Sequence, residues 1–213
     1  MAATDLVDLG NELKPFLGIP TSDLDKDELL DSFNAHARAL IESALDRHLV
    51  TRGALTEYHS IDRHTHRIYL TQYPVISITS VHESAALTYD ATTLLTSGTD
   101  YLLADANAGA LDRISGGGPI GWLAGYRVIQ VVYSAGYADT SSVPEDIKYQ
   151  CKRLIGTAWS EATRKEFGLS SVADDMGNIS RFFPPGLNAS MRDALEGYRR
   201  RDFSSTAEGV ASS

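Results

Sequence analysis

The sequence predicts an α+β fold: a small helical bundle with an inserted antiparallel β-sheet or small barrel, and an extended C-terminal segment ending in a short helix. Two observations lead to this prediction. Apolar residues recur at three- and four-residue spacing near both ends of the chain, as in amphipathic helices. Between these stretches, short runs rich in β-branched residues alternate with Gly- and Ser-containing turns, as in strands and hairpins.

The expected elements divide the chain into four regions. Its 213 residues are 43% hydrophobic, which is enough to bury a core. We expect N-terminal bundle helices in residues 1–50, a β-rich insertion in 51–142, a long bundle helix in 143–168, and an extended segment with a short helix and a disordered tail in 169–213.

Two helices are expected in the N-terminal region. The first spans residues 6–17; Pro15 predicts a kink or an early end, and Gly18 predicts its C-terminus. The second spans roughly residues 26–49, with acids in its first turn, where the helix dipole favours them. The acidic run lacks the glycine and distal glutamate of an EF-hand loop, so no calcium site is expected. The apolar stripe of the first helix comprises Leu6, Leu9, Leu13, Phe16 and Leu17.

Six short runs in the middle of the chain are candidate strands. Turn-rich pieces separate them, and this spacing is typical of a compact antiparallel sheet or small barrel. The triplet Gly116–Gly118 is followed by no Lys-Ser/Thr pair, so it predicts a hairpin loop and not a phosphate-binding loop. The candidate strands are Leu55–Ile61, Arg67–Thr71, Val75–His82, Tyr101–Leu103, Ala110–Ile114 and Arg127–Tyr133.

A long helix is expected from Pro144 to about Phe167. Proline suits the first turn of a helix, and the acids that follow it favour the positive end of the dipole. Cys151, the only cysteine, lies on the apolar stripe and is expected to be a buried structural thiol without an intramolecular disulfide. The bases predicted for the exposed face are Lys148, Lys152, Arg153, Arg164 and Lys165.

The C-terminal region is polar and rich in Gly, Ser and Pro. Residues 169–180 are expected to be extended or mobile, because they cannot bury much by themselves. Phe182 and Phe183 follow; they either anchor the segment on a partner or fold back on the chain's own core. A last helix, residues 191–201, carries apolar side chains on one side and three arginines at its C-terminus.

No catalytic constellation is evident in the sequence, and no nucleophile elbow (GxSxG) occurs. Four histidines in the β-rich region could serve as zinc ligands, but no nearby cysteine or HExxH helix accompanies them. They are His59, His64, His66 and His82. We expect surface or hairpin histidines, with no metal, no cofactor and no enzymatic activity. A metal-dependent hydrolase is the alternative that they leave open.

Composition limits the remaining classes of function. The net charge of −9 argues against a protein whose whole surface binds nucleic acid. Residues 1–50 hold ten acids and four bases, whereas residues 143–213 hold ten of each. No apolar run is long enough for a membrane span, and the first residues do not resemble a signal peptide. A protein made in a reducing cytoplasm is expected.

Four stretches, in this order, resemble the head–tail connector (adaptor) proteins of tailed bacteriophages. They are LKPFLGIP (13–20), YPVISITSV (73–81), the strand–turn–helix stretch from Val128 to Trp159, and LEGYRRRD (195–202). None is specific alone, and their shared order and spacing carry the resemblance. The large β-rich block resembles that of longer members of the family, which have a sheet inserted between the helices.

The resemblance implies a virion structural protein of the neck, assembled in the bacterial cytoplasm. Family members form a ring of about twelve copies, as a closed rotational interface allows. The ring lies beneath the portal protein and joins it to a stopper or tail-completion protein, and genomic DNA passes through its lumen. An acidic lining of that lumen would repel DNA and let it slide. The alternative is a tail-side connector, stopper or tail-completion protein of the same virion.

The resemblance also implies a docking segment. In this family the C-terminal segment reaches out and binds the portal, and ordering on binding makes such attachment conditional on the partner. The residues that correspond to it in this sequence are Phe182, Phe183, Leu195, Tyr198, Arg199, Arg200 and Arg201.

Overall fold

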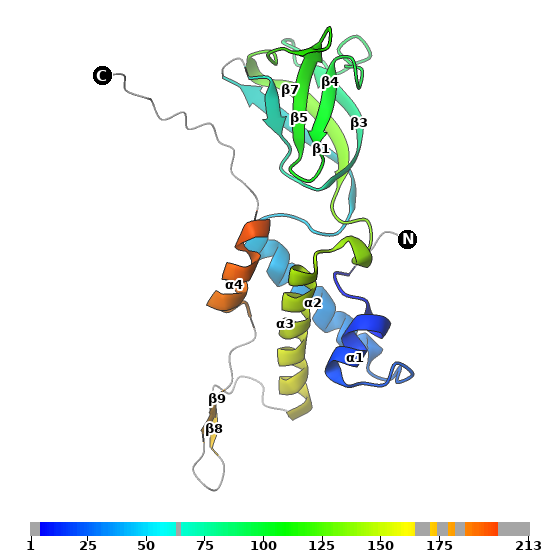
Figure 1. The fold of residues 1–213 in the computed structure, drawn as a ribbon, viewed down its shortest axis with the longest axis vertical. Coiled ribbons are helices and arrows are strands. Elements are labelled where there is room, and N and C mark those ends of the chain that lie inside the picture. Colours follow the sequence, from blue (N-terminus) through cyan, green and yellow to red (C-terminus); the bar gives the residue numbers. More distant parts are fainter. Residues whose placement is uncertain (1–4, 63–64, 165–170, 174–178, 182–185, 200–213) are drawn as a thin grey trace, which may run out of the picture. The chain divides into compact units, whose positions relative to one another are not determined.

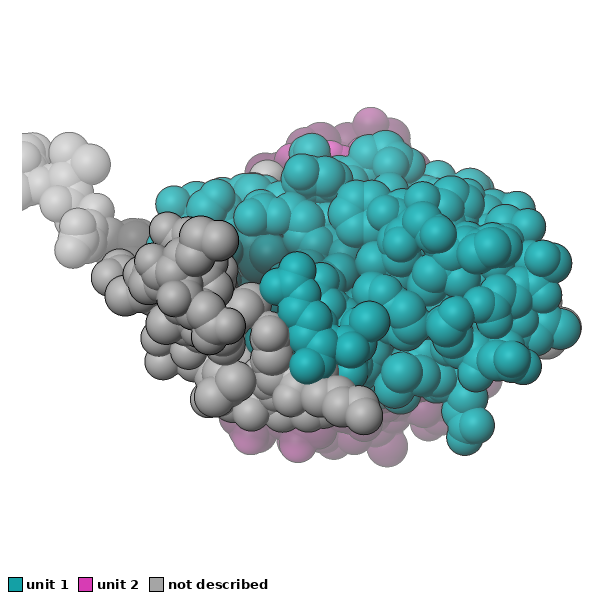
Figure 2. All heavy atoms as spheres, turned by 90° about the horizontal axis from the view of Figure 1, so that it is seen from below, with its two compact units in different colours: residues 1–52, 136–199 teal, residues 53–135, 200–213 magenta. Residues whose placement is uncertain are grey.

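The computed structural model describes residues 5–62, 65–164, 171–173, 179–181 and 186–199. The chain forms two compact units, coloured separately in Figure 2. The helical unit comprises residues 1–52 and 136–199, and the β unit comprises residues 53–135 together with residues 200–213, which lie outside the described part.

The helical unit is built on two long helices, α2 (Asp27–Leu45) and α3 (Glu145–Arg164). They pack side by side, with α1 (Lys14–Leu17) and α4 (Ala189–Leu195) on either side of the pair (Figure 1). A π-helical turn, η1 (Leu9–Leu13), leads into α1. Short 3-10 turns, η2 (Thr140–Ser142) and η3 (Glu196–Tyr198), precede α3 and follow α4.

The local chemistry explains where the helices begin and end. Pro15 lies in the first turn of α1, where its missing N–H needs no partner, so the predicted kink takes the form of a change from π-helix to α-helix. Gly18 ends α1 in the left-handed conformation, as expected. Helix α2 stops at Leu45 because Asp46 is left-handed, so it is shorter than predicted.

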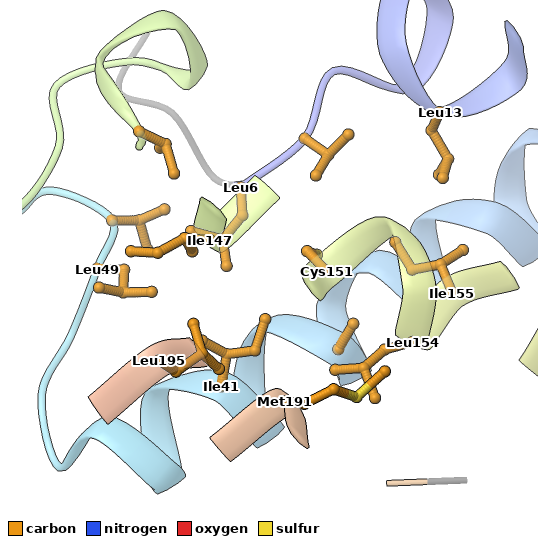
Figure 3. Close-up of a cluster of buried hydrophobic side chains, with 14 of the residues drawn as sticks. Leu6, Leu13, Ile41, Leu49, Ile147, Cys151, Leu154, Ile155, Met191 and Leu195 are labelled. Atoms are coloured by element: carbon orange, nitrogen blue, oxygen red, sulfur yellow. The ribbon is translucent and has the colours of Figure 1, made fainter. Parts of the chain in front are cut away.

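The core of the helical unit is formed by apolar side chains from α2, α3 and α4, together with residues of the N-terminal segment such as Leu6 and Leu13 (Figure 3). Cys151 lies in its interior, and its thiol donates to Asn34 Oδ1 at 3.7 Å, while Asn34 Nδ2 donates to the carbonyl of Val7 at 3.1 Å. Burial raises the pKa of the Cys151 thiol to about 12. The predicted buried thiol is therefore confirmed, and it is poorly suited to act as a nucleophile.

Two buried lysines fix the N-terminal segment to the long helices. Lys14 Nζ donates to the carbonyl of Asp23 at 2.8 Å and lies 2.6 Å from the carboxylate of Asp27, at the start of α2. Lys148 was predicted on the exposed face of α3 but is 3% exposed, because it pairs with Glu12 at 2.8 Å and Glu145 at 3.1 Å. Burial disfavours its charge, but these two carboxylates outweigh burial and raise the Lys148 pKa.

The β unit contains two antiparallel sheets. The first has the strand order β1 (Arg52–Ile61), β7 (Gly125–Ala135), β3 (Val75–Glu83), and β3 pairs with β7 through a register interrupted by two irregularities. The second has the order β2 (Arg67–Tyr69), β5 (Ala110–Ser115), β4 (Tyr101–Asp105), with the short β6 (Gly118–Pro119) beside β5.

The two sheets share one core, which contains Val81 and Val131 from the first sheet and Leu111 from the second. The indole of Trp122 is fully buried in this core, and the Arg113 guanidinium lies 5.8 Å from its ring centre. Arg113 also pairs with Glu83 of β3 at 3.0 Å, which ties the sheets together. The sheets do not close into a barrel, so of the two predicted alternatives the open sheet is confirmed.

All six predicted strands are present, and the described residues contain three further strands that the sequence did not predict. Gly116 and Gly117 form the β5–β6 turn and Gly118 begins β6, which confirms the hairpin prediction. A two-stranded hairpin, β8 (Ser171–Ala173) with β9 (Ile179–Arg181), lies in or next to the segment that was expected to be extended or mobile. Lys165, residues 167–170 and the predicted disordered tail lie outside the described residues.

The chain leaves and rejoins the helical unit at adjacent points. Tyr137 N donates to the carbonyl of Leu49 at 2.7 Å, and Thr51 Oγ1 donates to the carbonyl of Tyr137 at 2.7 Å. Gly136 lies against this junction with φ at +111°, and a Cβ there would be 2.7 Å from the carbonyl carbon and oxygen of Val50. Only glycine fits both constraints without strain.

We therefore expect Gly136→Ala to destabilise the protein by about 2 kcal/mol or more, because it combines a strained backbone with a clash against backbone atoms. The measurement is thermal or urea unfolding followed by circular dichroism. Gly53→Ala is the matched control, since a Cβ at Gly53 meets no atom within 4 Å. Equal unfolding midpoints for the two variants would contradict this account of the junction.

Candidate partner-binding site

The C-terminal helix α4 is held against the helical core. Asn188 caps it by accepting a hydrogen bond from the backbone N–H of Met191 at 2.9 Å. Met191 and Leu195, one turn apart, are buried and point toward Ile41 of α2 and Leu154 of α3 (Figure 3). The segment that contains the predicted docking residues is thus attached to the bundle by two apolar side chains.

Tyr198 and Arg199 follow α4 at the surface. Tyr198 is half-buried, and its hydroxyl donates to Asp146 Oδ2, at the start of α3, at 3.1 Å. Burial, followed by this hydrogen bond, raises the pKa of Tyr198. Arg199 lies 3.5 Å from Glu196, and both side chains are mostly exposed, so this ion pair contributes little to stability.

The structure describes three of the seven predicted docking residues. Leu195 is 1% exposed and makes its contacts within the chain, so a partner could reach only its neighbours. Tyr198 is partly exposed, and Arg199 is mostly exposed. Phe182, Phe183, Arg200 and Arg201 lie outside the described residues, and their role stays a prediction.

A surface that the sequence analysis missed lies where α1 meets α3. We name Phe16, Tyr149, Lys152 and Arg153 the aromatic–basic patch. Phe16 and Tyr149 are 46% and 52% exposed. Lys152 Nζ lies 6.0 Å from the ring centre of Phe16, and the Arg153 guanidinium lies 5.9 Å from that of Tyr149, so the four side chains form one surface.

The signal for this patch was present in the sequence. Residues 149, 152 and 153 lie at helical spacing on the face of α3 opposite its apolar stripe, which is where an exposed tyrosine stands out. Phe16 was assigned to the apolar stripe of its helix. In the structure, Leu13 of that stripe is buried, whereas the ring of Phe16 lies over α3, 3.5 Å from where a Cβ of Gly156 would be.

A second exposed surface lies at the start of α2. We name Leu24, Asp25, Glu28, Leu29 and Asp31 the acidic–apolar patch. All five side chains are exposed, Leu24 at 70%. Burial, followed by repulsion from the nearby Asp5 and Asp27, raises the pKa of Asp31.

The histidines do not form a metal site among the residues that the structure describes, in which no group of three metal-ligating side chains occurs. His64 lies outside these residues. His59, expected at the surface or in a hairpin tip, is largely buried, because alternate residues of β1 face the core of the β unit. Its Nε2 lies 3.3 Å from Glu57, so its charged form has a carboxylate neighbour but little access to solvent.

Glu57 is the centre of a polar cluster inside the β unit. Its carboxylate accepts hydrogen bonds from the Tyr133 hydroxyl at 2.6 Å and from Thr71 Oγ1 at 3.0 Å, and these connect β1, β7 and the chain after β2. Burial, followed by the Glu57 charge, raises the pKa of Tyr133. The cluster cross-links strands, and each of these polar atoms has a partner within the chain.

A membrane span is not found in the described part of the chain, whose helices are all too short or too polar to cross a bilayer.

Comparison with known proteins gives a match in structure only. No protein-family model matches the chain, and no curated protein matches its sequence. Solved structures that share its fold include chains from the neck of an empty gene transfer agent particle, computed with C6 symmetry, and from the neck of a native particle, computed with C12 symmetry. A chain from the virion of the native gene transfer agent also matches.

The match extends over nearly the whole of each chain. It covers 94% of this chain and 95–96% of the others, with TM-scores of 0.53, 0.51 and 0.52 and 18% sequence identity in each case. The chain therefore has the fold of a protein found in the neck of these particles. The fold expected from the resemblance to head–tail connectors is confirmed.

Acidic pH is expected to destabilise the β unit through His59. Burial lowers its pKa, more than the nearby Glu57 charge raises it. The pH window lies between the lowered pKa of folded His59 and the ordinary histidine pKa of about 6.5. Within it, the unfolded chain binds a proton that the folded chain does not. The free energy of unfolding should therefore fall as the pH drops through this window, and His59→Gln should reduce that dependence.

The measurement is urea unfolding between about pH 7 and pH 5, the range in which histidine titrates. Trp159→Phe leaves Trp122, in the core of the β unit, as the only fluorescent tryptophan. His36→Gln, at an exposed position on α2, is the control and should keep the pH dependence. An unchanged dependence in His59→Gln would show that this histidine does not couple protonation to folding.

Proposed function

We propose that this protein is a structural component of a virion neck, with no enzymatic role. The observation that carries the proposal is a fold shared over 94% of the chain with neck chains of gene transfer agent particles. The order of the connector-like stretches in the sequence supports it independently. A matched fold alone does not fix a function, so the assignment depends on these two observations together.

The protein acts as a ring of identical copies. The matching neck structures were computed with C6 and C12 symmetry, and a symmetric neck repeats one chain around an axis. A ring requires a heterologous contact, in which two different surfaces of the subunit meet. The exposed aromatic–basic and acidic–apolar patches supply surfaces of different chemistry for that purpose.

Within the neck we assign the protein to the head–tail adaptor position, under the portal. This position is supported by the C-terminal segment, which α4 attaches to the bundle and which continues through the exposed Arg199. A segment fixed at one helix can reach a partner while its base stays in the subunit. DNA would pass through the centre of the ring without sequence-specific contacts, as an acidic protein favours.

Electron microscopy of the full-length protein, alone and mixed with the portal protein of the same particle, tests the assignment. Rings, or an added ring of density on the portal, are the expected result. A protein that binds a stopper or tail protein but leaves the portal unchanged would move the assignment to the tail side of the neck. A protein that forms no ring and joins no neck component would overturn it.

Portal binding should depend on the C-terminal residues outside the core. We expect Phe182→Ala/Phe183→Ala with Arg199→Glu to weaken portal binding about tenfold or more, because interface aromatics and arginines carry a large share of binding energy. Surface plasmon resonance with immobilised portal measures the effect. Truncation is a poor test, since it removes the buried Met191 and Leu195 and would unfold α4.

Arg192→Glu is the matched control, as it makes the same charge change at an exposed position of α4. It should bind the portal like the wild type. If the triple variant keeps its affinity while the melting temperature is unchanged, the C-terminal segment is not the docking element, although the protein could still occupy the neck.

A further inference from the structure

Among the residues that the structure describes, the charged groups of the two exposed patches form no ion pairs. In the described part of the chain, the carboxylates of Asp25, Glu28 and Asp31 form no ion pair and accept no hydrogen bond. Lys152 and Arg153 likewise form no ion pair there. Each contacts an aromatic ring, and Arg153 Nη1 donates a hydrogen bond to Gln150 Oε1 at 3.2 Å. Both surfaces therefore keep charge available for a partner of opposite sign.

Each patch also exposes large apolar side chains beside its charges. Phe16 and Tyr149 are about half exposed, and Leu24 is mostly exposed. Exposed aromatic residues next to arginine are typical of the centre of a protein interface, where such side chains bind strongly. Scattered surface leucines need no explanation, but here they adjoin a concentration of charge.

The two patches lie on different sides of α1. The side chain of Lys14 reaches toward α2, to Asp23 and Asp27, whereas the ring of Phe16, two residues later, lies over Gly156 of α3. Successive helical residues are rotated by about 100°, so these two side chains point in nearly opposite directions. The patches thus cannot neutralise each other within one subunit, but they can do so between subunits.

We propose that the aromatic–basic patch of one copy binds the acidic–apolar patch of the next copy, and that this contact closes the ring. The inference rests on the proposed function, which requires a ring. It commits the patches to a head-to-tail contact, in which Lys152 and Arg153 meet Asp25, Glu28 and Asp31 while Tyr149 and Phe16 pack against Leu24. Repetition of one such contact around an axis closes a ring.

This contact also assigns a place to part of the acidic N-terminal segment. Asp25, Glu28 and Asp31 lie between subunits and are neutralised there, so they do not line the channel. Any repulsion of DNA in the lumen comes from other acids of the chain. The ring should weaken as salt is added, because exposed opposite charges at its interface are screened.

Charge exchange tests the contact on the full-length protein. Lys152→Glu/Arg153→Glu makes both patches acidic, and Asp25→Lys/Glu28→Lys makes both patches basic. Each variant alone should associate at least tenfold more weakly than the wild type, since like charges then meet. An equal mixture of the two should assemble again, because acidic and basic copies can alternate around the ring. Mass photometry and electron microscopy, with and without portal, follow assembly.

Two further variants sharpen the comparison. Arg52→Glu/Arg192→Glu makes the same charge change as the basic-side variant at exposed arginines outside both patches, and it should assemble like the wild type. Tyr149→Ala keeps the charge and should weaken association by about tenfold, as the loss of an interface aromatic does. Circular dichroism confirms that each variant is folded.

The outcomes separate the two proposals. If the wild type forms rings and the charge-reversed variants do as well, the contact is wrong while the neck function stands. If each variant fails and the mixture stays monomeric, the pairing of these two patches is also wrong. If the wild type is monomeric both alone and with the portal, the ring itself fails, and the inference fails with it.

Discussion

The backbone pairing of residues 49–51 with residues 136–137 makes the rest of the arrangement possible. It brings the two ends of an inserted unit of more than eighty residues to one point, so the helical unit can be completed by segments far apart in the sequence. Gly136 permits this approach, because any side chain there would overlap the backbone of Val50. An insertion whose ends are adjacent disturbs its host core little.

The helical unit then depends on charges that are buried in pairs. Lys14 fixes α1 to the start of α2, and Lys148 fixes η1 to α3. A buried lysine is costly without a partner, so these pairs specify how the N-terminal segment lies more than they add stability. The same placement turns Phe16 toward α3 and leaves Leu24 in solvent, so the packing of the interior decides which surfaces the subunit offers.

The proposed assembly role follows from surfaces of this kind and not from a reactive site. The polar cluster around Glu57 is hydrogen-bonded within the β unit, and the thiol of Cys151 is buried in the helical unit. The exposed surfaces of the helical unit include an aromatic–basic patch, an acidic–apolar patch and the end of the C-terminal helix. Helix α4 has a structural role as well as a proposed binding role, since its buried side contributes Met191 and Leu195 to the core.

The sequence by itself determined the helices, the six main strands and the burial of Cys151. Hydrophobic periodicity is a local property, so helices and strands can be predicted from it without knowing the tertiary contacts. This periodicity placed α3 within a few residues of its observed ends. The hairpin at Gly116–Gly118 was predicted from the glycines themselves. The sequence could not choose between a sheet and a barrel, because closure depends on which strands become neighbours.

Only the tertiary structure decided the fate of individual polar and aromatic side chains. The sequence predicts Lys148 at the surface, but in the structure it is buried in an ion pair with Glu12, which is distant in the sequence. The sequence predicts His59 at the surface or in a hairpin, but in the structure it is largely buried beside Glu57. Leu195 reads as a docking anchor, yet it fills the core of the bundle. For Lys148 and Leu195 the deciding neighbours come from distant parts of the chain, so the local sequence does not reveal them. For His59 the deciding factor is that the β1 face that carries it packs against the core of the β unit.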